Sequence, residues 1–154
     1  LEQFVKIVEG TSTLARFTIL DLGPGIPPST DRVLEYCNRL IIVVEPEKNV
    51  VTHTKALLED INLKVLGRDR ISIAVVNRVR SDQKLSRTQI QEMLGHPAAY
   101  IFTPVPEIAY QASRAKVPMV MLGEPGASPQ QHNNIQQYTA LAESIANQGQ
   151  KVSA

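Results

Sequence analysis

The sequence predicts an α/β protein with a mainly parallel sheet and helices on both faces of that sheet. Short apolar runs rich in β-branched residues alternate along the chain with stretches whose apolar residues recur at helical spacing. Such alternation is typical of right-handed βαβ crossovers. No internal repeat, low-complexity tract or long linker interrupts it, so the 154 residues are predicted to form one domain.

Four apolar runs are predicted to be strands, at 17–20, 40–44, 71–76 and 100–102. The run at 40–44, Leu-Ile-Ile-Val-Val, is the most apolar in the chain and predicts a strand buried on both faces. It ends just before Pro46, which cannot continue a central strand. A last short extended segment is expected at 117–122.

Between these runs the spacing of apolar residues predicts helices. Asn49 is the expected N-cap of the helix that follows the second strand. Ser86 and Gln89 form a capping-box pattern, and Gly95 can end the helix that they begin. The expected helices cover about residues 1–10, 31–37, 49–67, 86–95, 108–115 and 128–146.

The terminal helix has the strongest start signal, Ser128 as N-cap followed by Pro129 at the first helical position. We expect it to bury an apolar stripe and to fray from Asn147 onward. The residues of that stripe are Ile135, Tyr138, Leu141, Ala142 and Ile145.

Composition excludes several classes of function. Hydrophobic residues make up 43% and charged residues 20% of the chain, as in a globular protein, and a net charge of +1 gives no global field to recruit nucleic acid or membrane. The single cysteine, Cys37, excludes an internal disulfide framework, fits a reducing cytoplasmic setting and is expected to be a small buried apolar group.

Metal and hydrolase motifs are also missing. The three histidines are far apart with no partner at zinc-ligand spacing, and no serine lies in a nucleophile elbow. A cluster of basic residues around the third strand could contact DNA phosphates, or could be a solvated rim diluted by Asp69 and Asp82. Its members are Arg68, Arg70, Arg78, Arg80, Lys84 and Arg87.

Asp21 follows the first apolar run and opens the sequence Asp-Leu-Gly-Pro-Gly. Ligands of open α/β sheets bind at the carboxyl ends of the strands, where a carboxylate can hold Mg²⁺. Gly23 and Gly25 would let the backbone approach a phosphate closely. The alternative is a strand-to-helix turn that uses Asp and Gly for geometry alone.

Two later segments are expected at the same edge of the sheet. Asn77 and Arg78 follow the third apolar run, and the loop Pro104-Val-Pro-Glu107 follows the fourth. If the strands are parallel, these segments lie beside Asp21.

The order of these pieces resembles the carboxyl-terminal part of a ParA/MinD-type P-loop ATPase, and is most similar to the CpaE/TadZ branch that acts in pilus assembly and positioning. The resemblance runs from about Phe17 to Ile145. It implies a family-like core at 17–146, preceded by a helix and loop at 1–16 and followed by a tail at 147–154, all within a longer ATPase domain.

The resemblance implies ATP and Mg²⁺ as cofactors and a role for each matching residue. Asp21 would hold the Mg²⁺ shell through water, and Gly25 would sense the γ-phosphate. Asn77 would contact adenine, with Arg78 stacked near the base, although Asn77 could instead be only a strand cap. The loop around the adenine would be formed by Pro104, Val105, Pro106 and Glu107.

One part of the family pattern is missing from these residues: no GxxxxGK[ST] or GxGxxG motif occurs, and no Gly is followed by Lys. We therefore expect a longer parent, and we expect this chain alone not to hydrolyse ATP, because phosphoryl transfer depends on those positioned groups. A non-catalytic interaction module of the same fold, or a metabolic enzyme such as a cobyrinate amide synthase, are the alternatives.

The resemblance also implies partners. It predicts a homodimer formed on ATP and protein partners from a positioning or secretion machine, with DNA weakly supported and membrane contact at most peripheral. In the family, the strand that carries the phosphate loop lies between the strands matched by 17–21 and 40–44. Its absence here predicts that these two segments pair directly, that another chain or an upstream segment fills the gap, or that the chain aggregates.

Overall fold

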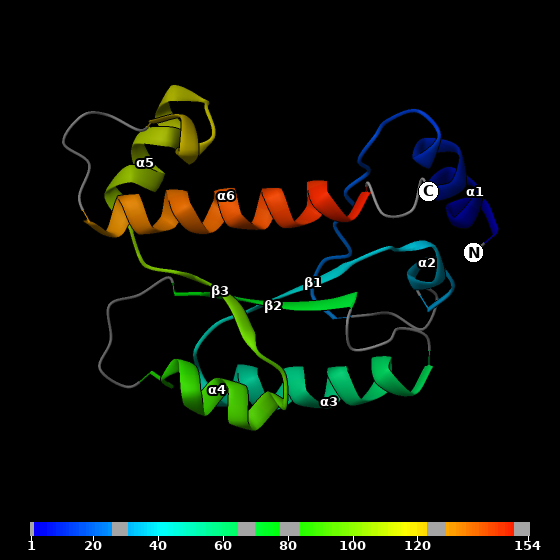
Figure 1. Cartoon of the computed structure of the whole chain (residues 1–154), viewed down its shortest axis with the longest axis horizontal. Coiled ribbons are helices and arrows are strands. Elements are labelled where there is room, and N and C mark those ends of the chain that lie inside the picture. Colours follow the sequence, from blue (N-terminus) through cyan, green and yellow to red (C-terminus); the bar gives the residue numbers. More distant parts are fainter. Residues whose placement is uncertain (1, 26–30, 65–69, 78–83, 123–128, 150–154) are drawn as a thin grey trace.

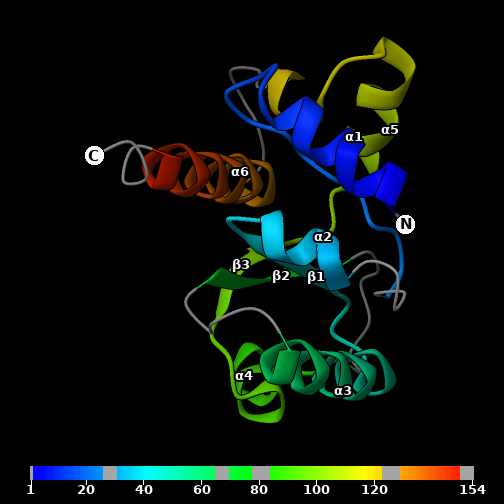
Figure 2. The same cartoon turned by 90° about the vertical axis from the view of Figure 1, so that its right-hand side faces the viewer.

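The structure is a computed structural model, and it describes residues 2–25, 31–64, 70–77, 84–122 and 129–149. A sheet lies between two layers of helices, with α6 on one face and α3 and α4 on the other (Figure 1). The view from the side separates these layers and places α1 and α5 on the same side of the sheet as α6 (Figure 2). The predicted α/β class is therefore confirmed.

The sheet has three strands in the order β1-β2-β3, and both pairs are parallel. These are β1 (Leu40–Val44), β2 (Ile71–Val76) and β3 (Ala98–Phe102). The central strand β2 is buried at its first five positions, as its continuous apolar sequence predicts. The register between β2 and β3 shifts between Ile73 and Ala74.

Helices α3 (Lys48–Lys64) and α4 (Arg87–Leu94) cover one face of the sheet over the larger hydrophobic core. The predicted capping box is present at Ser86, and Gly95 ends α4 in the left-handed conformation with φ of 65°. Asn49 is not an N-cap, because helical hydrogen bonding already starts with the Val51 N–H donating to the Glu47 carbonyl at 2.9 Å.

Helix α6 (Pro129–Gly149) covers the other face over a smaller core. It runs through Asn147 without ending there, and its expected N-cap, Ser128, lies outside the described residues. The expected apolar stripe is wrong in part: Ala142 is exposed and Tyr138 is 38% exposed, while Gln131 and Asn134 are buried. Asn134 meets the backbone at the end of β3, which needs hydrogen-bonding partners, and Nε2 of Gln131 donates to the Leu122 carbonyl at 3.4 Å.

Between β3 and α6 the chain forms α5 (Pro106–Ala115) and the short 3₁₀ helix η3 (Met119–Leu122). The extended segment expected at 117–122 is therefore wrong. A turn that closes with the Met121 N–H donating to the Pro118 carbonyl at 2.9 Å replaces it.

The first part of the chain forms α1 (Glu2–Ser12) and α2 (Asp31–Tyr36), and α1 continues past Gly10. The strand expected at 17–20 is absent: this segment is irregular, and Ile19 is 88% exposed. No described strand lies beside it to complete a hydrogen-bonded ladder, so the apolar run alone does not make a strand.

Candidate functional site

The carboxyl ends of the three parallel strands place Pro46, Asn77 and Thr103 along one edge of the sheet. The Asn77 N–H donates to the Phe102 carbonyl at 3.0 Å, which joins the end of β2 to the end of β3. The sequence placed Asn77 and the loop after β3 at this edge, and the structure brings Asn77 and the start of that loop together.

A pocket of about 90 Å³ opens beside Asn77 at this edge. The side-chain oxygen Oδ1 of Asn77 is buried and has no hydrogen-bond partner among the described residues. Buried carbonyl oxygens normally have a donor, so this atom marks a place where a ligand N–H group would be stabilised. The other walls are Pro46, Val75, Lys84, Leu85, Arg87, Ile90 and Ile101.

The segment before α4 forms a pocket wall that the sequence patterns did not predict. The Leu85 N–H donates to the Pro46 carbonyl at 3.0 Å, which holds this segment against the end of β1. Lys84, half-buried, lines the pocket beside Leu85. A signal was present: Lys84 and Leu85 directly precede the capping box of the helix that follows β2, so they return to the strand-end edge.

Of the three described members of the basic cluster, Arg70 and Arg87 have structural partners, and Lys84 lines the pocket. Arg87 donates to the Ala98 carbonyl at 2.8 Å and to Oε1 of Gln91 at 3.2 Å. Arg70 donates to the Cys37 carbonyl at 3.4 Å. Arg68, Arg78 and Arg80 lie outside the described residues. DNA contact by this cluster therefore stays a prediction.

The loop expected at 104–107 is shorter than predicted, because α5 already starts at Pro106 and includes Glu107. Val105 is the N-cap residue, Pro106 is at the helix start, and Glu107 lies in the first turn, where its charge complements the helix dipole. Pro104 and Val105 are half-buried, whereas Pro106 and Glu107 are exposed. None of these four residues lines the pocket at Asn77, so the loop and the pocket are neighbours that share only the end of β3.

Asp21 and Gly25 lie in an exposed turn. The Gly23 N–H donates to Oδ1 of Asp21 at 2.9 Å, and both glycines have positive φ, 69° at Gly23 and 79° at Gly25. This is the turn geometry of the simpler interpretation. Among the described residues, no hydrogen bond or pocket wall joins this turn to Asn77.

Metal-binding clusters are not found in the described part of the chain: no three His, Cys, Asp or Glu side chains gather there. Mg²⁺ keeps several waters and usually takes one or two protein carboxylates together with substrate phosphates. A single carboxylate such as Asp21 therefore fits Mg²⁺ and does not fit a metal held entirely by protein ligands.

No protein-family model and no curated protein matches the sequence. Among solved structures, the fold matches that of a ParA family ATPase, so the class is an α/β protein with the ParA-type P-loop ATPase fold. That structure is a ParA family ATPase from Chlorobium tepidum TLS, with a TM-score of 0.73 and 17% sequence identity. The match covers 88% of this chain and 55% of the other, so this chain spans about half the length of that protein.

At this identity the likeness shows the fold alone. The predicted resemblance to ParA-type ATPases is confirmed at the level of fold. In the described part of the chain, no helix has both the length and the hydropathy that a membrane span requires.

Proposed function

We propose that this chain is the carboxyl-terminal part of an ATP-binding regulatory ATPase of the ParA/MinD/CpaE type. Such a protein would dimerise on ATP and act on protein partners in positioning or pilus assembly. The observation that carries the proposal is the buried Oδ1 of Asn77, which has no hydrogen-bond partner among the described residues, at the strand-end edge of a sheet with this fold.

Asn77 has the chemistry that an adenine contact needs. Its amide can accept from an N–H group through Oδ1 and donate through Nδ2, which matches the adjacent donor and acceptor on an adenine edge. The pocket walls around it are mainly apolar, as suits the faces of a base, with Pro46, Leu85 and Ile90 among them. Lys84 adds a positive charge on the same wall, where it would favour a nucleotide over a neutral base.

The remaining residues would complete the nucleotide contact. Mg²⁺, when bound, neutralises phosphate charge. Asp21 would orient its water shell through Oδ2, since Oδ1 already accepts the Gly23 N–H. Gly25 would present its backbone to the terminal phosphate, Arg78 would lie near the base, and the loop 104–107 would cover it.

A second candidate is a non-catalytic interaction module of the same fold. The observation in its favour is that the 154 residues contain no phosphate-binding loop, and that Asp21 already serves a turn. The two candidates differ in whether the edge at Asn77 discriminates adenine from guanine, since a module would have no reason to do so.

Titration with ATP and GTP, each with Mg²⁺ and followed by NMR, tests the proposal on this chain. Asn77→Ala should weaken ATP about tenfold or more and leave GTP nearly unchanged, because a two-point amide-to-base contact is worth roughly 1–3 kcal/mol. Asn38→Ala, at an exposed asparagine, is the matched control. Equal losses for both nucleotides, or none for ATP, would contradict the adenine assignment.

Hydrolysis is a separate test. The chain alone should show no ATP turnover, because phosphoryl transfer needs the positioned groups of a phosphate-binding loop. Mg²⁺-dependent turnover that Asp21→Ala abolishes would contradict this expectation and would mean that the chain is catalytic by itself.

A further inference from the structure

The outer edge of β3 is hydrogen-bonded by side chains of α6, and no described strand pairs with it there. Oε1 of Gln137 accepts the Ile101 N–H at 3.0 Å. One helical turn earlier, Oδ1 of Asn134 accepts the Thr103 N–H at 2.8 Å, and Nδ2 of Asn134 donates to the Thr103 carbonyl at 2.8 Å. Asn134 therefore pairs with both backbone groups of one residue, as a neighbouring strand would.

This pairing is shielded and reinforced. Asn134 is 2% exposed, so water does not compete for its amide. A third hydrogen bond joins the two residues, because the Thr103 hydroxyl donates to Oδ1 of Asn134 at 3.1 Å. Loss of the Asn134 side chain would leave the Thr103 N–H and carbonyl without their partners in a buried place, which costs more than the loss of an exposed hydrogen bond.

The hydrogen bonds between Asn134 and Thr103 matter because Thr103 lies where the chain leaves β3. Thr103 is the last residue before Pro104, and Val105, the N-cap residue of α5, accepts the Ala109 N–H at 3.0 Å in the first turn of that helix. On the other side of β3, the Phe102 carbonyl accepts the Asn77 N–H. The end of β3 is thus held between Asn77 and Asn134.

We propose that Asn134 is a positioning residue for the loop 104–107, and that it sets how tightly the strand-end edge holds adenine. The second half of this inference rests on the proposed function. Asn134 acts through Thr103 and touches no ligand: it fixes the direction in which the chain leaves β3, and so the distance of the loop from Asn77.

The test compares Asn134→Ala with Gln137→Ala. Both variants remove an amide that bonds to the same strand edge, but only Asn134 holds the residue that starts the loop. Backbone ¹⁵N order parameters at Val105 and Glu107 should fall clearly in Asn134→Ala and stay at wild-type values in Gln137→Ala. ATP affinity should fall about tenfold in the first variant and less than about twofold in the second.

Asn134→Asp is a second variant, which also serves if Asn134→Ala does not fold. A protonated carboxyl can donate to the Thr103 carbonyl and accept its N–H, as the amide does, whereas a carboxylate can only accept. The order parameters at Val105 and Glu107 should therefore rise toward wild-type values as the pH falls. Wild-type and Gln137→Ala proteins carry the same histidines, so they correct for other titrations.

The outcomes separate the inference from the proposed function. Equal disorder in the two alanine variants, unchanged order parameters in Asn134→Ala, or no recovery of Asn134→Asp at low pH would each overturn the positioning role. If the wild-type chain binds neither ATP nor GTP, the proposed function fails, while the order parameters still decide whether Asn134 positions the loop.

Discussion

The two outer edges of the sheet, at β3 and at β1, differ in whether other described parts of the chain cover them. At β3, α6 provides amide side chains for the edge backbone, and the ring of Tyr138 packs 4.5 Å from that of Phe102. At β1, no described strand pairs on the side away from β2, and Val43 is 62% exposed. Side chains of α6 hydrogen-bond the β3 edge, whereas the β1 edge lacks a partner within the described residues.

This difference shows that an apolar strand sequence does not ensure burial of the strand. The segment at 17–20 was expected to lie in the same sheet, yet it makes no ladder, and Phe17 is 43% exposed. Direct pairing of this segment with β1 is therefore excluded by the structure. Filling of the gap by another chain or an upstream segment, and aggregation, stay predictions.

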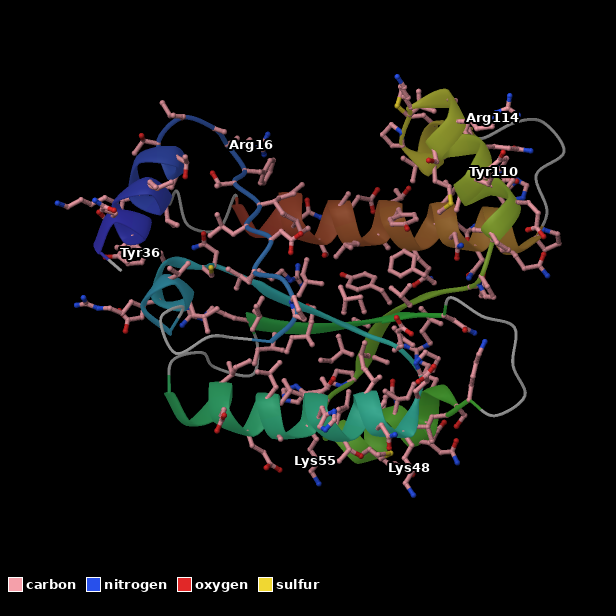
Figure 3. The ribbon with its side chains drawn as sticks, turned by 180° about the vertical axis from the view of Figure 1, so that it is seen from behind. Arg16, Tyr36, Lys48, Lys55, Tyr110 and Arg114 are labelled. Atoms are coloured by element: carbon pink, nitrogen blue, oxygen red, sulfur yellow. The ribbon has the colours of Figure 1, made fainter. Side chains whose placement is uncertain are left out.

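Side chains far from both edges provide reference positions for the comparison of the two edges. Lys48 and Lys55 on α3 project away from the sheet, and Tyr110 and Arg114 lie on the outer part of α5 (Figure 3). These exposed positions provide control substitutions whose effect on stability should be small.

Phe102→Ala should produce the largest difference between the edges. Phe102 is 6% exposed beneath α6, so its truncation should lower the free energy of unfolding by about 3–5 kcal/mol. Val43→Ala at the open edge should cost less than about 1 kcal/mol, since little apolar surface is buried there. Urea unfolding measures both, and similar losses would mean that the β1 edge is covered in solution.

Val43→Lys tests whether the β1 edge recruits other chains. Lysine on an edge strand opposes edge-to-edge pairing, so this variant should weaken self-association of the chain about tenfold or more without a comparable loss of stability. Sedimentation velocity over a range of concentrations provides the measurement, with Lys55→Ala as a surface control. A monomeric wild-type chain would contradict the prediction.

Tyr100→Phe tests the polar contacts under α6. The Tyr100 hydroxyl lies 2.7 Å from Oγ of Ser144, which also accepts from Arg39 at 2.9 Å. Loss of the hydroxyl should lower the free energy of unfolding by about 1 kcal/mol. Tyr110→Phe, at a side chain that is 65% exposed, should change it by less than about 0.5 kcal/mol. The idea fails if thermal denaturation shows the same shift for both.

The reactivity of Cys37, just before β1, should show the smallest of the predicted effects. Burial raises the pKa of its thiol, and the Arg70 charge opposes this only in part. The thiolate is the reactive form, so iodoacetamide should alkylate Cys37 several-fold more slowly than free cysteine at pH 8, with a rate that rises as the pH approaches the raised pKa. A rate equal to that of free cysteine would show that the β1 end opens easily.

Local signals in the sequence predicted well those features that depend on interactions between residues close in sequence. The alternation of strands and helices, the capping box at Ser86 and the end of α4 at Gly95 are all confirmed. The strand at 17–20 could not be judged locally, since a strand needs a neighbour. The burial of Asn134 was missed because periodicity arguments assume that helices bury apolar residues, whereas α6 meets a strand edge.

The candidate site was predictable in its position but not in its walls. Strand order placed Asn77 and the loop at 104–107 on one edge, as the structure has them. The pocket is formed on its other side by the segment before α4, where Lys84 had been interpreted only as a member of a basic cluster. The position of the pocket along the strand-end edge depends on tertiary packing, which the spacing of residues in the sequence does not predict.

The dependence of β3 on α6 has a consequence for synthesis on the ribosome. Domains form from their amino-terminal parts as the chain emerges, and α6, which begins at Pro129, emerges after β3. Until then the nascent sheet would have exposed backbone on both sides, with no helix above Tyr100 and Phe102. A holdase chaperone would therefore be needed most during the interval before the last helix docks.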